Sequence, residues 1–277
     1  MKMKMLSAAF RHLTAAALAV LFTTTAHASP DDVSKPLLVI GASFANGKTP
    51  FNDAGVAPLG GVSVGLGSYL SLGDALVKNP RLPGYVINEA QAGATSFDRV
   101  GCNPGPACVF GNWKSYDRQL MQAAARVTVP GAGTLLAKYV VISLGNDCLH
   151  SDAFGVPQSQ ATPCSYNDMK AYVDRLIAVG RHATDLGLTP IYDIYPAYDS
   201  LNLPFAAQAF GLNWIIDRSS YNQLRDLHRT RIPAMLPNAV MLDIWSSYQN
   251  IGDGLHPDPR TTRRAAELIA WYIGRPH

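Results

Sequence analysis

Pro36-Leu-Leu-Val-Ile-Gly-Ala-Ser43 is the stretch from which the architecture of this chain can be worked out. The apolar run 37–40 is uninterrupted, which is typical of a short strand buried on both faces of a parallel sheet. Gly41 and Ala42 allow a tight turn, so Ser43 is expected at the carboxyl end of that strand, where open α/β sheets bind their ligands. Ser43 is therefore a candidate nucleophile toward an ester, and a strand that simply ends in a small-residue turn is the alternative.

Strand-like runs alternate with helical patterns along the rest of the chain. Further strands are expected at 85–88, 138–144, 190–195 and 239–244, and helices at 62–77, 113–126, 166–186, 217–231 and 260–273. This alternation predicts an α/β protein with a mostly parallel sheet and helices on both faces. With 277 residues, 48% of them hydrophobic, the chain can bury a large core.

The first 28 residues have the pattern of a secretory signal peptide. Three basic residues precede an apolar run at 13–22, and Ala26-His27-Ala28 is a small-residue cleavage site. The apolar run is short for a membrane span, although an uncleaved anchor is the alternative. We therefore expect cleavage after Ala28, a secreted or periplasmic protein with no integral membrane segment, and a single domain over residues 29–277.

The formal net charge of +3 comes from the three basic residues of this leader. Without it, Lys+Arg falls from 23 to 20 and equals Asp+Glu at 20. A neutral protein with scattered basic residues gives no reason to expect binding to nucleic acid.

Four cysteines follow the leader, at 102, 108, 148 and 164. An even number in an exported chain indicates two disulfides. The simplest pairing joins Cys102 to Cys108 and Cys148 to Cys164, but three pairings are possible and spacing does not choose among them. A zinc site is disfavoured because no closely spaced Cys/His set accompanies these residues.

A second polar motif, Asp253-Gly-Leu-His256-Pro257, follows the last expected strand. A carboxylate three residues before a histidine can bind the Nδ1 proton of the ring, which leaves Nε2 to take a proton from a serine. A polar turn that caps the final helix is the alternative. Its place after a strand puts the motif at the same sheet edge as Ser43.

Two more stretches after expected strands offer hydrogen-bond donors for the oxyanion that attack by Ser43 would create. Gly93 lets a backbone N–H approach closely, the Asn146 side chain offers an amide, and the Ser43 N–H is a third donor. Either stretch alone is also typical of a plain turn. The four stretches together, in order and each after a strand, predict a hydrolase.

In the order Ser43, Gly93, Asn146, Asp253 and His256, the chain resembles the SGNH hydrolases, also called the GDSL esterase/lipase family. The match extends over nearly all of residues 29–277. The resemblance implies a three-layer α/β/α sandwich of flavodoxin-like type with a five-stranded sheet. It also implies that Ser43 is the nucleophile, His256 the general base and Asp253 the acid that orients it, with oxyanion donors from Ser43, Gly93 and Asn146.

Two positions depart from the family pattern. Ala42 stands where the family usually has Asp before the serine; that aspartate is not part of the triad, so we expect the chemistry to be retained. The third block, usually Gly-x-Asn-Asp, is Leu144-Gly145-Asn146-Asp147 in this chain. Because the glycine is shifted by one place, the backbone that brings Asn146 to the oxyanion is expected to differ.

These features predict a secreted serine esterase or lipase that works through an acyl-enzyme, without a metal or organic cofactor. The family acts on lipids, short acyl esters, thioesters and acetylated polysaccharides, so the substrate is a small-molecule, lipid or polysaccharide ester. An apolar insertion at 196–214 favours an acyl or aromatic ester if it lines the groove rather than the core. A carbohydrate O-acetylesterase and a non-catalytic secreted binding protein on the same scaffold are the alternatives.

Overall fold

Five parallel strands form the central sheet, in the order β2-β1-β3-β4-β5. They are β1 (Leu37–Ile40), β2 (Val86–Asn88), β3 (Tyr139–Ile142), β4 (Thr189–Asp193) and β5 (Val240–Leu242). This order is that of flavodoxin-like doubly wound folds. The α/β fold predicted from the sequence is therefore confirmed.

This computed structural model describes residues 34–46, 70–98, 113–145, 147–148, 164–210 and 217–275. The predicted leader, Cys102, Cys108, Asn146 and part of the insertion at 196–214 lie outside these ranges. Within them, no helix is long and apolar enough to cross a membrane.

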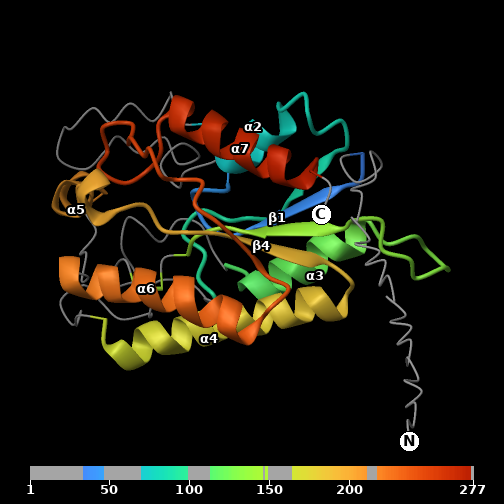
Figure 1. Cartoon of the computed structure of the whole chain (residues 1–277), viewed down its shortest axis with the longest axis horizontal. Coiled ribbons are helices and arrows are strands. Elements are labelled where there is room, and N and C mark those ends of the chain that lie inside the picture. Colours follow the sequence, from blue (N-terminus) through green and yellow to red (C-terminus); the bar gives the residue numbers. More distant parts are fainter. Residues whose placement is uncertain are drawn as a thin grey trace, which may run out of the picture.

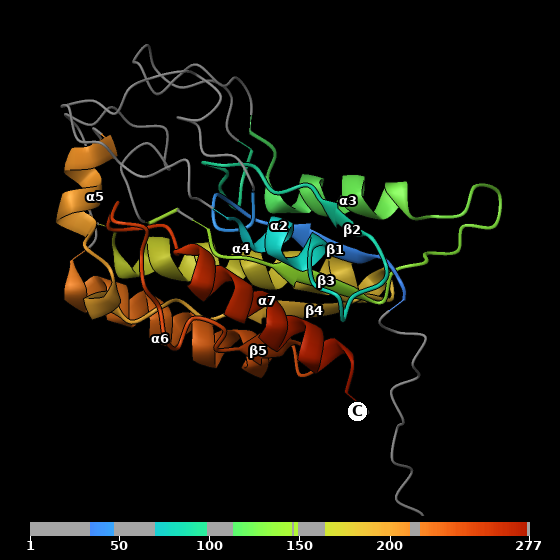
Figure 2. The ribbon, with the colours of Figure 1, turned by 90° about the horizontal axis from the view of Figure 1, so that it is seen from above.

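Helices cover both faces of the sheet (Figure 1). On one face lie α2 (Leu72–Val77) and α7 (Pro259–Ile273). The other face carries α3 (Tyr116–Arg126), α4 (Tyr166–Asp185) and α6 (Arg218–Met235). The short helix η5 (Tyr198–Ser200) and α5 (Leu203–Phe210) follow β4, and Figure 2 shows α5 at the end of the sheet toward which the strands point. The chain thus forms the three layers of an α/β/α sandwich.

The helix starts are written locally in the sequence. The four long helices begin at polar residues whose side chains accept a hydrogen bond from the backbone N–H three positions on, namely Ser115, Ser165, Asp217 and Asp258. Ser165 and Asp168 complete a reciprocal capping box. Helix α6 runs four residues beyond the expected end at 231, and Ile232 in that extension is fully buried. Packing of this last turn therefore outweighs the helix-breaking tendency of Pro233.

Burial along the sheet follows strand position. Every residue of β1 and β3 is buried, whereas β2 and β5 at the edges are partly exposed. The registers Ile40 with Ile142 and Ile142 with Tyr192 bring the carboxyl ends of the three central strands level with one another. Polar residues that follow these strands therefore meet at one edge, which positions the candidate site.

Candidate active site

Ser43, His256 and Asp253 form a continuous hydrogen-bonded chain, although the serine and the histidine are 213 residues apart in the sequence. The Ser43 Oγ lies 2.9 Å from His256 Nε2, and His256 Nδ1 lies 2.6 Å from Asp253 Oδ2. A carboxylate can only accept, which places the ring proton on Nδ1 and leaves Nε2 to accept from the Ser43 hydroxyl. The three side chains are thus arranged for transfer of the serine proton to the imidazole.

The Asp253 carboxylate is held by the backbone of its own loop. Asp253 is fully buried, and its second oxygen, Oδ1, accepts from the backbone N–H groups of Leu255 and His256, each at 2.8 Å. The Asn202 N–H, at the start of α5, donates to the Gly254 carbonyl at 2.8 Å. The loop is therefore fixed both internally and against the segment that follows β4.

The turn that carries Ser43 depends on Gly41. This residue has φ = 144°, and a Cβ there would lie 2.9 Å from the Ser143 carbonyl oxygen. Only glycine allows this close approach with that backbone conformation. The Gly41 N–H donates to Gln119 Oε1 of α3 at 2.8 Å. Gln119 is fully buried. It was not predicted as a site residue, because a helical pattern does not indicate which strand end a buried polar side chain will contact.

Aromatic side chains form the floor beneath His256. The Phe44 ring lies 5.9 Å from the His256 ring and packs edge-on against Trp245, with centroids 5.6 Å apart. Tyr248 packs against both Phe44 and Trp245, and its hydroxyl donates to the Leu255 carbonyl. This cluster shields one side of the imidazole from water and fixes the plane of its ring.

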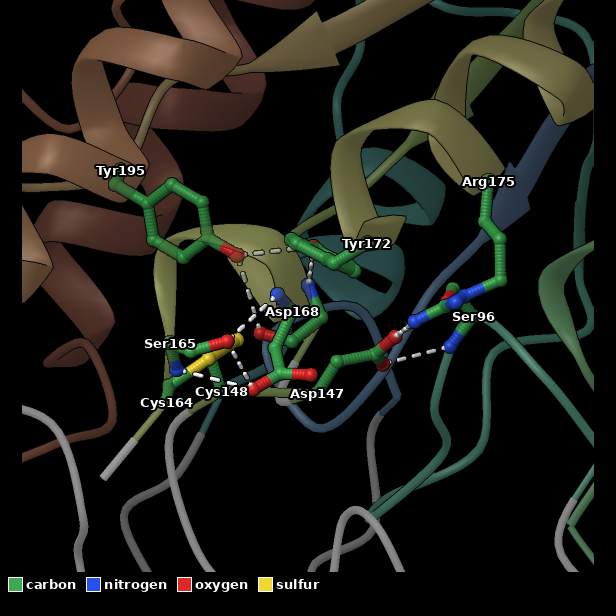
Figure 3. Close-up of a disulfide and its surroundings, with 10 residues drawn as sticks. Ser96, Asp147, Cys148, Cys164, Ser165, Asp168, Tyr172, Arg175 and Tyr195 are labelled. Carbon is green, nitrogen blue, oxygen red and sulfur yellow. Dashed lines mark hydrogen bonds and ion pairs between the residues drawn. A yellow bond between two sulfur atoms is a disulfide. The ribbon is translucent and has the colours of Figure 1, made fainter. Parts of the chain in front are cut away.

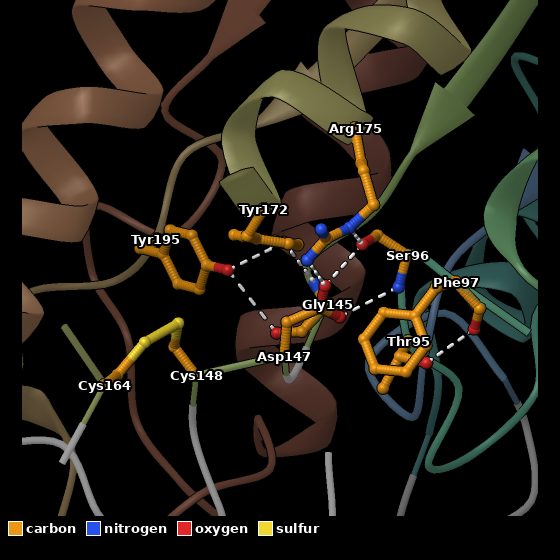
Figure 4. A network of polar contacts seen from close by, with 10 residues as sticks. All are labelled: Thr95, Ser96, Phe97, Gly145, Asp147, Cys148, Cys164, Tyr172, Arg175 and Tyr195. Carbon is orange, nitrogen blue, oxygen red and sulfur yellow. Dashed lines mark hydrogen bonds and ion pairs between the residues drawn. A yellow bond between two sulfur atoms is a disulfide. The ribbon is translucent and has the colours of Figure 1, made fainter. Parts of the chain in front are cut away.

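The expected oxyanion donors fall in two places. Gly93 lies in the turn after β2 with φ = 80°, and Asn146 lies outside the described residues. The backbone immediately before Asn146 is described, and tyrosine hydroxyls hold it; Figure 4 shows those of Tyr172 and Tyr195 beside Gly145. Tyr116 donates to the Leu144 carbonyl at 3.0 Å, the Gly145 N–H donates to Tyr172 at 3.1 Å, and Tyr195 donates to the Tyr172 hydroxyl at 2.9 Å.

This cluster of hydroxyls explains the glycine at position 145. A Cβ on Gly145 would lie 2.8 Å from the Tyr172 hydroxyl and 2.9 Å from that of Tyr116, and both tyrosines are fully buried. No local pattern around Gly145 indicates this contact, because the tyrosines come from α3 and α4. The glycine at position 145 thus has a local steric reason.

We expect Gly145→Ala to lower the free energy of unfolding by about 1–3 kcal/mol, because the added methyl group overpacks the site. Urea denaturation measures this cost. Tyr172→Phe removes one of the two clashing oxygens, so the same glycine substitution should cost less in that background. Equal losses of unfolding free energy in the two backgrounds would show that the contact with the Tyr172 hydroxyl is not the source of the cost.

An ion pair between a buried carboxylate, Asp147, and a partly exposed guanidinium, Arg175, lies beside this backbone (Figure 4). Asp147 is fully buried; its Oδ1 accepts from the Ser96 N–H at 2.8 Å, and its Oδ2 accepts from the Ser96 hydroxyl and from Arg175 Nη2 at 3.1 Å. Burial raises the pKa of Asp147, and the Ser96 and Arg175 hydrogen bonds oppose that rise. The Arg175 guanidinium also lies over the Phe97 ring, 5.3 Å from its centroid. The network ties the segment after Gly93 to the segment after Gly145.

A disulfide adjoins the same network. Cys148 pairs with Cys164, and Figure 3 shows this bond beside Ser165 and Asp168, the capping box of α4. It joins the end of the third block to the residue before the N-cap of α4, the helix whose Tyr172 and Arg175 bind Gly145 and Asp147. One of the two expected pairings is therefore present, and the other lies outside the described residues.

Comparisons with known proteins agree with this architecture. No family model and no curated protein sequence matches the chain. Among solved structures, a carbohydrate acetylesterase from Sinorhizobium meliloti has a TM-score of 0.55 and 16% identity, covering 86% of this chain and 98% of that one. A carbohydrate acetylesterase family member from the same organism has a TM-score of 0.52 and 19% identity, with 87% and 99% covered. The chain therefore shares its fold, over most of its length, with these esterase structures, and this is the fold that the resemblance to the SGNH hydrolases implies.

Proposed function

We propose that this chain is an SGNH hydrolase that cleaves carboxylic esters through an acyl-enzyme on Ser43. The observation that carries the proposal is the hydrogen-bonded chain from Ser43 Oγ through His256 to the buried Asp253. A serine whose hydroxyl donates to an oriented, unprotonated imidazole nitrogen is an activated nucleophile. The fold shared with esterases supports the same reaction class.

The reaction follows from the geometry in two halves. Ser43 Oγ attacks the ester carbonyl carbon while His256 Nε2 takes the hydroxyl proton, and the carbonyl oxygen becomes an oxyanion. Collapse of this intermediate breaks the C–O bond, and the imidazolium gives its proton to the departing alcohol. Water then attacks the acyl-enzyme, His256 accepts its proton, and the carboxylic acid leaves as Ser43 recovers its hydrogen.

Asp253 and the oxyanion donors support both halves. Asp253 keeps the Nδ1 proton in place and stabilises the imidazolium that forms in each half. In our proposal the oxyanion accepts from the Ser43 and Gly93 N–H groups and from the Asn146 amide. The tyrosine hydroxyls around Leu144 and Gly145 restrict the backbone that leads to Asn146. One such donor is typically worth ~3 kcal/mol in the transition state.

The second candidate function within this class is a carbohydrate O-acetylesterase. The two structural neighbours described above favour it, since both are carbohydrate acetylesterase structures. The apolar insertion between β4 and α6 argues the other way, because Phe205 of α5 is only half-buried and could contact an acyl chain.

We further propose that the protein is exported, which the Cys148–Cys164 disulfide supports because such bonds persist in oxidising compartments.

A fluorophosphonate probe tests the function directly. We expect stoichiometric labelling of the folded protein at low probe concentration, mapped by peptide mass spectrometry to Ser43, and no labelling after heat unfolding. Turnover of p-nitrophenyl esters from acetate to palmitate, and acetate release from acetylated xylan, then identify the acyl and alcohol parts of the substrate. A folded protein that neither reacts with the probe nor turns over any ester would overturn the proposal in favour of a binding protein.

A further inference from the structure

Asp193, the last residue of β4, is a buried acid for which the proposed reaction has no use. It is 1% exposed, and its side chain lies between the carboxyl ends of β3 and β5. Its Oδ2 accepts from the Ser143 hydroxyl at 2.9 Å and from Trp245 Nε1 at 3.1 Å. Its Oδ1 has no hydrogen-bond partner among the described residues. A buried carboxyl with one unsatisfied oxygen is costly, so its retention calls for an explanation.

One of its two partners leads to the nucleophile. Ser143 directly follows β3, and its N–H donates to the Ile40 carbonyl at 3.0 Å. Its backbone and Cβ pack against the Cα of Gly41, where an added Cβ would lie within 3.0 Å of them. Gly41 begins the turn that ends at Ser43. The Ser143 hydroxyl therefore connects the Asp193 carboxyl to the residue that sets the path of the nucleophile turn.

The other partner leads to the general base. Trp245 lies in the segment between β5 and the loop that carries His256. Its ring packs edge-on against Phe44, and the Phe44 ring contacts the His256 ring. Rotation of the Trp245 indole away from Asp193 would open the packing beneath the imidazole. Asp193 Oδ2 thus binds both Ser143, which packs against the Ser43 turn, and Trp245, which packs beneath His256.

We propose that Asp193 is a positioning residue for the proposed ester hydrolysis, which holds the Ser43 turn and the floor of His256 in register through Ser143 and Trp245. This inference rests on the function proposed above. Desolvation on burial raises the pKa of Asp193 to about 7, against hydrogen bonds from Ser143 and Trp245 that lower it. Its charge therefore changes within the range in which a serine esterase works. Hydrogen bonds to an ionised carboxylate are stronger than those to a neutral one, so ionisation tightens both supports.

The titratable groups around Asp193 come from four elements. Tyr116 of α3 and Tyr172 of α4 interact electrostatically with the Asp193 carboxyl. Both stay neutral, because burial raises the pKa of each hydroxyl. Helix α6 contributes His228, which packs against Tyr195 and is neutral above acid pH because burial lowers its pKa to about 3. The fourth is His256 on the catalytic loop, behind Phe44. The two tyrosines and His228 therefore stay neutral near pH 7, where the pKa of Asp193 lies.

Two substitutions of similar size separate the effect of the Asp193 hydrogen bonds from that of its side-chain volume. Asp193→Asn retains an oxygen that can accept from Ser143 and Trp245, and places its NH₂ where Oδ1 has no partner. Asp193→Leu removes the acceptor. We expect the Leu variant to lose about 10- to 100-fold in kcat with KM changed less than about twofold, since small misplacement of reacting groups is costly. The Asn variant should recover most of that loss. Asp243→Leu, the same change at an exposed carboxyl after β5, is the matched control and should behave as wild type.

The pH profile tests the role of the charge. The ratio of wild-type kcat to that of Asp193→Asn cancels every pH effect that the two proteins share. We expect this ratio to rise by about three- to tenfold between pH 5.5 and 8.5, with a midpoint near the pKa of about 7. A ratio that stays constant, in a folded Asn variant, would overturn the inference even if the Leu variant failed to fold.

A stability measurement checks the ionisation independently. The pKa of Asp193 is raised in the folded protein relative to the usual value of 3.8, so its contribution to stability is full below that value and is lost as the pH rises through about 7. The difference in Tm between the Asn variant and the wild type should therefore grow in favour of the variant from pH 4 to pH 8. Failure of the two proposals is distinguishable: an inert wild type removes the esterase, whereas an active wild type with an equally active, folded Leu variant removes only the role of Asp193.

Discussion

Replacing Ser43 with alanine is expected to reduce kcat for p-nitrophenyl acetate by on the order of 10⁵-fold, close to the background rate. The Ser43 Oγ is the atom that His256 Nε2 contacts at 2.9 Å, and alanine offers nothing in its place that can form the acyl-enzyme. The role proposed for this hydroxyl is bond formation and not substrate binding, so we expect KM and Tm to stay near their wild-type values. Steady-state kinetics with active-site titration of the wild type measures the loss.

The matched control for this substitution is Ser246→Ala, at an exposed serine between β5 and the catalytic loop. It should retain wild-type kcat and incorporate the fluorophosphonate probe normally. Ser43→Ala, in contrast, should not react with the probe. Turnover by Ser43→Ala at more than about a hundredth of the wild-type rate would place the nucleophile elsewhere in the chain.

Asp253→Asn is expected to lower kcat by about 10⁴-fold through the wrong histidine tautomer. The amide oxygen can still accept from the N–H groups of Leu255 and His256, so the loop should keep its conformation. The amide NH₂ then faces His256 Nδ1 as a donor, which moves the ring proton to Nε2. Nε2 can no longer accept the proton of Ser43. We therefore expect the rate of fluorophosphonate labelling to fall together with kcat.

Asp258→Asn is the control, because it makes the same chemical change five residues along the chain. Asp258 caps α7 by accepting from the Thr261 N–H at 2.6 Å, and asparagine caps helices about as well. This variant should retain the activity of the wild type. If Asp253→Asn kept more than a tenth of the wild-type kcat, the carboxylate would have no part in orienting the imidazole.

Much of the fold was predictable because its signals are local. The apolar run of β1 is made of adjacent residues. Each polar cap, Ser115, Ser165, Asp217 and Asp258, directly precedes its own helix, which hydrophobic spacing marks. The rule that carboxyl ends of parallel strands share one edge then brought Ser43 and the Asp253–His256 loop together. The contact of 2.9 Å between Ser43 and His256 is what that rule predicts for this pair.

Helix ends and strand ends were less predictable than their existence. The strand at 138–144 was expected to be longer than β3, which stops at Ile142. Beyond that residue the Ser143 N–H still donates to the Ile40 carbonyl, but the Ser143 hydroxyl binds Asp193 and the Leu144 carbonyl accepts from Tyr116. Such partners lie on other elements and leave no mark on the strand itself.

Local signals were thus enough to predict which strands and helices follow one another along the chain, which residues follow each strand, and that Ser43 lies near Asp253 and His256. The contacts that support these residues come instead from packing between elements. Gly41 meets Gln119 across 78 residues, and Gly145 meets a tyrosine cluster from three elements. The carboxyl of Asp193 lies between Ser143 and Trp245. The physical reason is that a buried polar group is defined by its partners, and side-chain partners on neighbouring elements follow from how helices and strands pack, which no local pattern encodes.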